Sequence, residues 1–210
     1  MGDKIYSFYI KPNKYLLSVS PIRGYYHTYY RGYKNVGNPD YLNILKNTYN
    51  SYPETVLNLA TKELEAVLLE DLPQIPKLIG IDLLVVCVIP RAKAENVYSP
   101  TQLLFRSTIQ KVIQNFPNYF IDGTKYIIRH TNTRTTHLPR KIPNYNNDGP
   151  DPYTGITKDT CYISSKVLNK DILLIDDIYT PGVNIVEDAI NALLKKGAKS
   201  ITFYCVGYTI

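Results

Sequence analysis

The spacing of apolar residues predicts three helices, over residues 51–71, 99–116 and 184–197. In each of them apolar side chains recur every three or four positions, which places them on one face of a helix. The first two begin with the capping-box pattern, at residues 51–54 and 99–102. In this pattern two side chains satisfy backbone N–H groups that the helix leaves free. We expect Pro73 and Pro76 to end the first helix, and Asn184 to cap the third.

Short continuous apolar runs between the helices predict strands. They cover residues 81–89, 126–128, 172–175 and 201–206, and we expect an additional strand over 15–19. The runs lack period-two alternation, which is typical of strands buried on both faces. Strands that alternate with helices indicate an α/β fold in which helices flank a parallel sheet on both faces. Ligands bind beyond the carboxyl ends of such strands, so the chemistry is sought directly after each run.

The composition fits one compact globular domain with a small appendage. The 210 residues are 44% hydrophobic and 20% charged, which excludes disorder as the main state. No apolar run approaches the roughly 18 to 20 residues that cross a bilayer, and the first 15 residues lack the apolar core of a signal peptide. We therefore expect a cytoplasmic protein. Cys87, Cys161 and Cys205 are too scattered for a disulfide framework or a zinc site.

Positive charge and tyrosine concentrate at the start of the chain. The first 53 residues hold seven Lys/Arg against two Asp/Glu, and eleven of the 20 tyrosines. Basic groups neutralise phosphates and aromatic rings stack on bases, so this composition suits a nucleotide or single-stranded nucleic acid. The ordinary alternative is a set of tyrosines packed half-buried at a domain edge. We divide the chain into a basic, Tyr-rich hood with one helix, residues 1–76, and a core, residues 77–210. The apolar face of residues 5–17 offers a surface for a homodimer.

The strongest local signal is the stretch 171–184, in which a buried strand runs into two acids, a tight turn and a helix. The free amides and the positive end of the helix dipole make such a turn an anion cradle. The carboxylates of Asp176 and Asp177 suit sugar hydroxyls or a hydrated divalent cation instead. A ribose 5-phosphate satisfies both halves.

The sequence LLIDDIYTPGVN at 173–184 resembles the signature of the type I phosphoribosyltransferases. That signature is an apolar strand, two acids, two mostly apolar residues and Thr-Thr-Gly-x-Thr/Ser. The resemblance implies that Asp176 and Asp177 hold the ribose hydroxyls of phosphoribosyl pyrophosphate (PRPP) or a hydrated Mg²⁺. It extends over residues 81–209 and is greatest to the competence-associated subgroup, although the zinc-binding front end of many of its members is missing. The residues that it places around the 5-phosphate are Thr180, Pro181, Gly182, Val183 and Asn184.

Two positions of the turn depart from the family pattern. Pro181 replaces the second threonine and offers neither a hydroxyl nor an N–H to a phosphate. Asn184 replaces the last Thr/Ser, but it can still cap the helix and donate amide hydrogens. The loss of one donor to a charged acceptor costs about 1.5 to 3 kcal/mol, which weakens binding by one or two powers of ten.

A second strand end, after residue 89, carries Arg91 and Lys93. In the family that the motif resembles, the loop after the first core strand contacts pyrophosphate, and the resemblance gives Arg91 and Lys93 that role. A guanidinium can bridge two phosphoryl oxygens. As an isolated feature, two basic residues in a loop are also typical of a plain surface.

The segment 123–155 suggests a flexible loop. Residues 123–141 carry five Lys/Arg and no acid, and residues 143–155 are rich in Pro, Asn, Asp and Gly. Such long loops in compact domains are typical of lids or disordered segments. Arg129-His130-Thr131 resembles the start of the loop that folds over the reacting centre in the family, so Arg129 joins the substrate-binding residues. His130 and His137 are interpreted as solvated rather than as a metal or proton-transfer pair.

The resemblance implies a Mg²⁺-dependent phosphoribosyltransferase. It would transfer the ribose 5-phosphate of PRPP to an unidentified nitrogenous base or amine and release pyrophosphate, with Asp176, Asp177 and Arg91 as the catalytic set. No residue presents itself as a general base for the acceptor. The alternative, favoured by Pro181, is a non-catalytic protein on the same fold that senses PRPP or a nucleotide, or that holds nucleic acid through its N-terminal segment.

Overall fold

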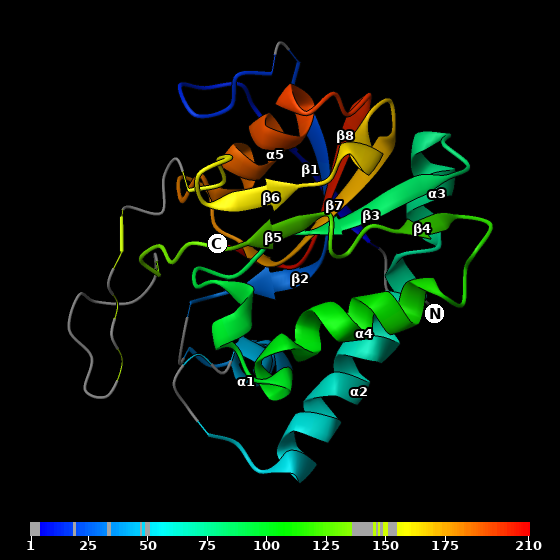
Figure 1. Cartoon of the computed structure of the whole chain (residues 1–210). Helices are drawn as coiled ribbons and strands as arrows, with labels where there is room; N and C mark the ends of the chain where they lie inside the picture. The colour runs from blue at the N-terminus through cyan, green and yellow to red at the C-terminus, as the bar shows by residue number, and fades with distance from the viewer. Residues whose placement is uncertain are drawn as a thin grey trace.

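The computed structural model (Figure 1) describes residues 5–18, 20–32, 35–46, 48, 51–135, 145, 147, 149–150 and 155–210. Within these residues, six strands form the main sheet in the order β1-β2-β8-β7-β3-β4. Neighbours run parallel except β1, which pairs antiparallel with β2. The predicted α/β class with a largely parallel sheet is confirmed. The strands are β1 (Tyr6–Ile10), β2 (Ile22–Tyr30), β3 (Leu84–Val88), β4 (Phe120–Asp122), β7 (Asp171–Tyr179) and β8 (Ser200–Thr209).

Helices lie on both faces of this sheet, as the apolar runs predict. In Figure 1, α5 lies above the sheet, and α1, α2 and α4 lie below it. The α-helices are α1 (Asp40–Lys46), α2 (Glu54–Asp71), α3 (Gln74–Ile79), α4 (Leu104–Ile113) and α5 (Ile185–Lys195). Short 3₁₀ helices are η1 (Glu95–Val97), η2 (Pro100–Leu103) and η3 (Ser165–Val167).

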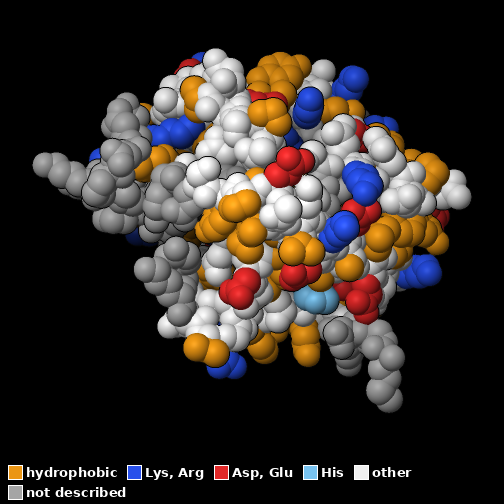
Figure 2. Space-filling view, turned by 90° about the horizontal axis from the view of Figure 1, so that it is seen from below, with side chains coloured by type: hydrophobic (Ala, Val, Ile, Leu, Met, Phe, Trp, Pro, Cys, Tyr) orange, Lys and Arg blue, Asp and Glu red, His pale blue; other side chains and the backbone are white. Residues whose placement is uncertain are grey.

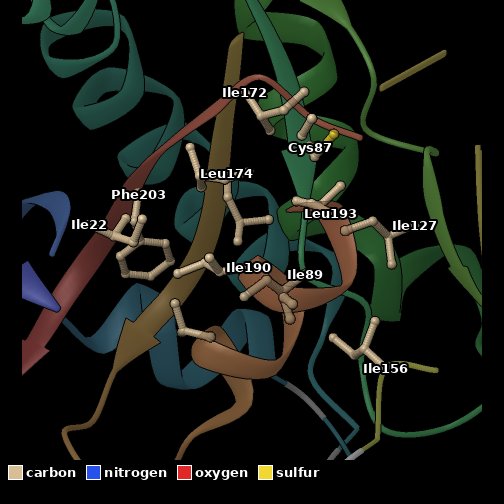
Figure 3. Close-up of a cluster of buried hydrophobic side chains, with 14 of the residues drawn as sticks. Ile22, Cys87, Ile89, Ile127, Ile156, Ile172, Leu174, Ile190, Leu193 and Phe203 are labelled. Atoms are coloured by element: carbon tan, nitrogen blue, oxygen red, sulfur yellow. The ribbon is translucent and has the colours of Figure 1, made fainter. Parts of the chain in front are cut away.

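The central strands are buried on both faces. In β7, Ile172 and Leu174 pack in the layer that contains α5. The intervening residues Leu173 and Ile175 pack in the opposite layer, with α2 and α4. Figure 3 shows part of this first layer, in which Leu174 of β7 and Phe203 of β8 lie on the side of the sheet that Ile190 of α5 covers. Because both faces need apolar groups, the strand sequences show no alternation.

The helix ends agree with the sequence prediction in part. Ser99 and Gln102 form the predicted capping box, in which Gln102 Oε1 accepts the Ser99 N–H at 3.1 Å. The box predicted at residues 51–54 is wrong: Pro53 occupies the N-cap position of α2 and makes no side-chain cap bond. Pro76 does not end a helix either, because it lies in the first turn of α3. Backbone N–H groups in a first turn have no acceptor within the helix, so a proline there costs no helical hydrogen bond.

The strand prediction needs two corrections. The run at 126–128 becomes β5 (Ile127–Arg129), which pairs antiparallel with β6 (Cys161–Ile163) in a separate small sheet. Residues 15–18 are irregular, and residue 19 lies outside the described part of the chain, so no strand is described there. The Asn13 side chain accepts the backbone N–H groups of Tyr15 and Leu16 at 2.7 and 2.8 Å, which bends this segment.

The segment assigned to a hood supplies two strands of the main sheet instead. Strands β1 and β2 both fall within residues 1–76, and β2 pairs directly with β8. Tyr25 and Tyr26 are buried on β2 in the two opposite core layers. Tyrosines thus occupy core positions that aliphatic residues occupy in the other strands. Because these tyrosines make the segment look polar, the sequence pattern did not predict strand β2.

A buried carboxylate joins α2 to the sheet. The Asp71 side chain is fully buried at the end of α2, and its Oδ2 accepts the Tyr204 hydroxyl of β8 at 2.7 Å. The same oxygen lies 3.1 Å from His27 Nδ1 on β2. Among the described residues, neither Asp71 Oδ1 nor the nearby Tyr41 hydroxyl has a hydrogen-bond partner. This cluster holds the helix layer to two adjacent strands.

The surface opposite α5 has no single electrostatic character. Figure 2, seen from below, shows Lys/Arg and Asp/Glu side chains interspersed among hydrophobic groups rather than gathered into one basic patch. Of the helices described, none has the length and apolar character required to cross a membrane.

Candidate functional site

A cavity of about 270 Å³ lies beyond the carboxyl ends of β3 and β7, where the fold class predicts a ligand. Its walls come from the end of β7, the loop after β3, the end of α1 and the start of α5. Pro181 and Gly182 belong to the turn beside it but do not line it. The predicted site residues that do line it are Arg91, Lys93, Arg129, Asp176, Asp177, Thr180, Val183 and Asn184.

The acidic doublet lies within β7 rather than after it, because β7 continues to Tyr179. Asp177 N–H donates to Asp176 Oδ1 at 2.9 Å, and Ile178 N–H donates to Asp177 Oδ1 at 2.6 Å. Burial, together with the adjacent charge of Asp177, raises the pKa of Asp176 well above that of an ordinary carboxyl. On the other side, Lys46 Nζ of α1 lies 3.5 Å from Asp177 Oδ2.

The turn after β7 satisfies one of its own amides. Val183 N–H donates to the Thr180 carbonyl at 3.1 Å, across Pro181 and Gly182. Gly182 has a φ of 84°, so proline followed by a left-handed glycine fits a type II turn. The Val183 amide is therefore committed within the protein, and Pro181 has none. Thr180 Oγ1 pairs with Thr209 Oγ1 of β8 at 2.8 Å.

The start of α5 leaves a set of backbone donors. Asn184 occupies the N-cap position with a φ of 62°, but its side chain donates to the Gly182 carbonyl at 2.9 Å and does not cap the helix as predicted. The amides of residues 185–187 have no acceptor within the helix and are the donors that an anion can use. Glu187 and Asp188 in the same turn carry charge that opposes an anion there.

The left-handed backbone of Asn184 gives a stability prediction. We expect Asn184→Ala to lose about 1 kcal/mol more free energy of unfolding than Asn184→Gly, because alanine is strained at positive φ. Both variants lose the side-chain bond to Gly182, so their difference isolates the backbone. Urea denaturation measures it, and equal losses would show that residue 184 does not keep this conformation.

Arg91 is bound by the protein itself. Its guanidinium donates to the carbonyls of Lys46 and Gln102 and, at 3.0 Å, to Thr48 Oγ1. It also lies over the Tyr98 ring, with 4.7 Å between guanidinium carbon and ring centroid. The guanidinium that sequence analysis assigned to pyrophosphate thus joins the end of α1 to η2 and shapes the cavity wall.

Arg129 is likewise a positioning residue. Its side chain is buried, and it donates to the carbonyls of Arg91 and Gly155 at 2.8 and 2.7 Å. Burial lowers the pKa of its guanidinium. Asp188 accepts the N–H groups of Gly155 and Ile156 at 2.6 and 2.7 Å. Arg129 and Asp188 therefore fasten residues 155–156 to α5 and to the loop after β3.

Lys93 lies in the cavity wall with its side chain largely buried. Its Nζ is 5.9 Å from the centre of the Tyr145 ring, and its backbone N–H donates to the Tyr98 hydroxyl at 2.9 Å. His130 pairs with Thr131 Oγ1 at 3.0 Å and does not line this cavity. The flexible loop predicted over residues 123–155 is only partly described, because His137, Arg140, Lys141 and most of 143–155 lie outside the described residues.

Helix α1 and the segment 95–106 also contribute to the cavity, which no motif in the sequence indicates. Lys46 and Thr48 line the cavity, and so do Glu95 and Arg106, which form an ion pair at 2.8 Å. Only the surplus of positive charge at the start of the chain hinted at Lys46. Among the described residues, six Lys/Arg and four Asp/Glu line the cavity, and this surplus of positive charge suits an anionic ligand.

The doublet can supply part of a magnesium shell. No group of three or more His, Cys, Asp or Glu side chains suited to a metal occurs among the described residues. Mg²⁺, however, usually keeps several waters and takes one or two carboxylates together with substrate phosphates. Asp176 and Asp177 offer the one or two carboxylates that such a magnesium site takes from the protein.

No protein-family model and no curated protein matches the sequence. The fold and the cavity together define the class: an α/β protein with a cavity at the carboxyl ends of parallel strands, lined by both basic and acidic residues.

Proposed function

We propose that the protein is a Mg²⁺-dependent phosphoribosyltransferase that transfers the ribose 5-phosphate of PRPP to a nitrogen acceptor. One observation carries the proposal: the acidic doublet, the turn before α5 and a basic wall border the same cavity. These are the groups needed for the ribose, the 5-phosphate and the pyrophosphate of one ligand. The stretch 173–184, which resembles the type I signature, supplies the first two.

In this reaction the bond between ribose C1 and the pyrophosphate oxygen breaks, and a bond from C1 to the acceptor nitrogen forms with inversion. The acceptor's proton leaves to solvent. Asp176 and Asp177 accept the ribose hydroxyls and favour positive charge that develops on the sugar. The first amides of α5 bind the 5-phosphate, and Lys93 with Lys46 faces the pyrophosphate. Mg²⁺, when bound, neutralises pyrophosphate charge.

The experiment measures PRPP binding and pyrophosphate release separately. We expect isothermal titration calorimetry with MgCl₂ to show saturable PRPP binding. We expect pyrophosphate release with at least one member of a panel of adenine, hypoxanthine, uracil and ammonium. The absence of any PRPP binding by the folded protein would rule out the proposed function.

A non-catalytic PRPP or nucleotide sensor is the second candidate. It is favoured by the turn, where Pro181 lacks an N–H and the Val183 amide is already bonded, and by the commitment of the Arg91 guanidinium to protein acceptors. These features remove donors to the 5-phosphate and to the pyrophosphate, and a transferase needs its contacts to the leaving pyrophosphate most in the transition state. PRPP binding without pyrophosphate release on any acceptor would favour the sensor.

Nucleic-acid binding by the N-terminal segment stays a prediction, and it cannot be tested by deleting the segment. Removal of the segment would remove β1 and β2, so single substitutions are required. Tyr6 and Tyr29 expose 46% and 44% of their surface beside the buried Tyr26, whose centroid lies 5.2 and 5.3 Å from theirs. If bases stack on these rings, Tyr6→Ala with Tyr29→Ala should weaken retention of a single-stranded oligonucleotide at low salt by about tenfold or more. Unchanged retention would exclude this surface.

A further inference from the structure

The acidic doublet already has a cation from its own chain. Lys46, the last residue of α1, places Nζ 3.5 Å from Asp177 Oδ2. Both side chains line the cavity, and they expose only 28% and 26% of their surface. The pair therefore lies in the ligand cavity and not on the open surface, where such pairs contribute little.

The backbone that carries Lys46 is fastened to the cavity wall. The Arg91 guanidinium donates to the Lys46 carbonyl and to Thr48 Oγ1. Gln102 Nε2 donates to the Thr48 carbonyl at 3.2 Å. Three segments that are distant in the sequence thus meet at the end of α1, which fixes where the lysine stem begins. Its flexible four-carbon stem leaves the ammonium free to move between neighbouring acceptors.

The Lys46 ammonium and a divalent cation would compete for the Asp177 carboxylate, and each would weaken the binding of the other. Asp177 Oδ1 already accepts the Ile178 N–H, so Oδ2 is the oxygen that faces Lys46. A metal ion at the doublet would meet the positive ammonium at close range, and like charges a few ångströms apart repel strongly in a partly buried site. Binding of the metal therefore requires that Lys46 move.

We propose that Lys46 is the resident counter-ion of the doublet and a donor-binding residue. In the ligand-free protein its ammonium neutralises Asp177 and competes with a divalent cation. With PRPP and Mg²⁺ bound, Asp177 would hold the cation and the Lys46 ammonium would turn from Asp177 to the pyrophosphate. The competition with metal stands on the ion pair alone, whereas the pyrophosphate contact rests on the proposed function.

The first arm of the test uses Mn²⁺ alone as the probe, followed by the electron paramagnetic resonance signal of the free ion. Lys46→Met keeps the stem and removes the charge, so Mn²⁺ should bind about fivefold tighter or more than to the unchanged protein. Lys46→Arg should restore the original affinity. The matched control is Lys111→Met, which removes an ammonium paired with Glu65 at 2.7 Å outside the cavity and should change nothing. If folded Lys46→Met binds Mn²⁺ with the same affinity as the unchanged protein, Lys46 does not compete with the metal.

The second arm measures PRPP binding by calorimetry at MgCl₂ concentrations that fill the doublet in both proteins, so that competition between Lys46 and the cation no longer contributes to the difference. Loss of one charged contact to pyrophosphate should weaken PRPP binding to Lys46→Met by about tenfold or more. Unchanged affinity would overturn the pyrophosphate contact. If the unchanged protein binds no PRPP, the proposed function and this contact both fail, while the Mn²⁺ arm still decides whether Lys46 competes with metal.

Discussion

Replacement of both acids, Asp176→Asn with Asp177→Asn, is expected to reduce PRPP affinity by about 100-fold or more. Each carboxylate that accepts a ribose hydroxyl or a magnesium-bound water contributes about 1.5 to 3 kcal/mol, and two such contributions correspond to two or more powers of ten. Asparagine keeps the shape and can still accept the N–H groups of Asp177 and Ile178. Calorimetry with MgCl₂ gives the affinity directly.

Stability serves as the control for this double variant. Burial and its neighbour raise the pKa of Asp176, so at neutral pH the ionised form is less favourable in the folded than in the unfolded protein. Removal of the Asp176 charge should raise the free energy of unfolding, whereas Asp177→Asn removes the partner of Lys46 and should lower it, so the double variant should stay within about 1 kcal/mol of the original. Asp82→Asn on the exposed surface should leave PRPP affinity unchanged. A folded double variant that binds PRPP within about threefold of the original would show that the doublet is not the ribose site.

The doublet and its turn were predictable because their chemistry is local. A buried strand, two acids, a glycine and a helix start are contiguous in the sequence, and strand β7 and helix α5 carry them to one edge of the sheet. The position of that edge follows from the parallel order of the strands. The conformation of Asn184 was not predictable. An asparagine at this position can either accept from the helix amides or donate to a nearby carbonyl, and here its side chain donates to the Gly182 carbonyl.

The roles of the basic residues were not predictable in the same way. Arg91 follows a buried strand, as an anion-binding arginine would, but whether its guanidinium is free depends on Lys46, Thr48 and Gln102. Those acceptors reach it only through the packing of α1 and η2 beside β3. Lys46 had no motif around it for the same reason: its partner Asp177 is remote in the sequence.

The N-terminal strands were hidden by composition. The tyrosines of this segment were interpreted as residues that stack on bases. In β2, tyrosine side chains instead pack in both core layers, while the backbone of this strand pairs with β8. The phenol hydroxyl makes a tyrosine-rich strand look polar, although most of the side chain is apolar surface. Buried polar groups that need partners, such as the Tyr204 hydroxyl, are the consequence of building a core this way.

Asp71→Ala is therefore expected to lower the free energy of unfolding by about 3 to 5 kcal/mol, the largest stability effect that we predict outside the aliphatic core. The substitution leaves the buried Tyr204 hydroxyl without the carboxylate that accepts it and removes the partner of His27. It also breaks the link between α2 and two strands. Urea denaturation at neutral pH measures the change, and Asp82→Ala on the surface should stay within about 0.5 kcal/mol of the original.

Asp71→Asn separates the hydrogen bond from the charge. Its amide oxygen can still accept the Tyr204 hydroxyl, so this substitution should cost clearly less free energy of unfolding than alanine does. Asp71 does not line the ligand cavity, so folded Asp71→Asn should bind PRPP as the original protein does. If alanine and asparagine both cost less than about 1 kcal/mol, the cluster does not hold the helix layer to the sheet. A change in PRPP affinity would instead show that the two sites are coupled through β2 and β8.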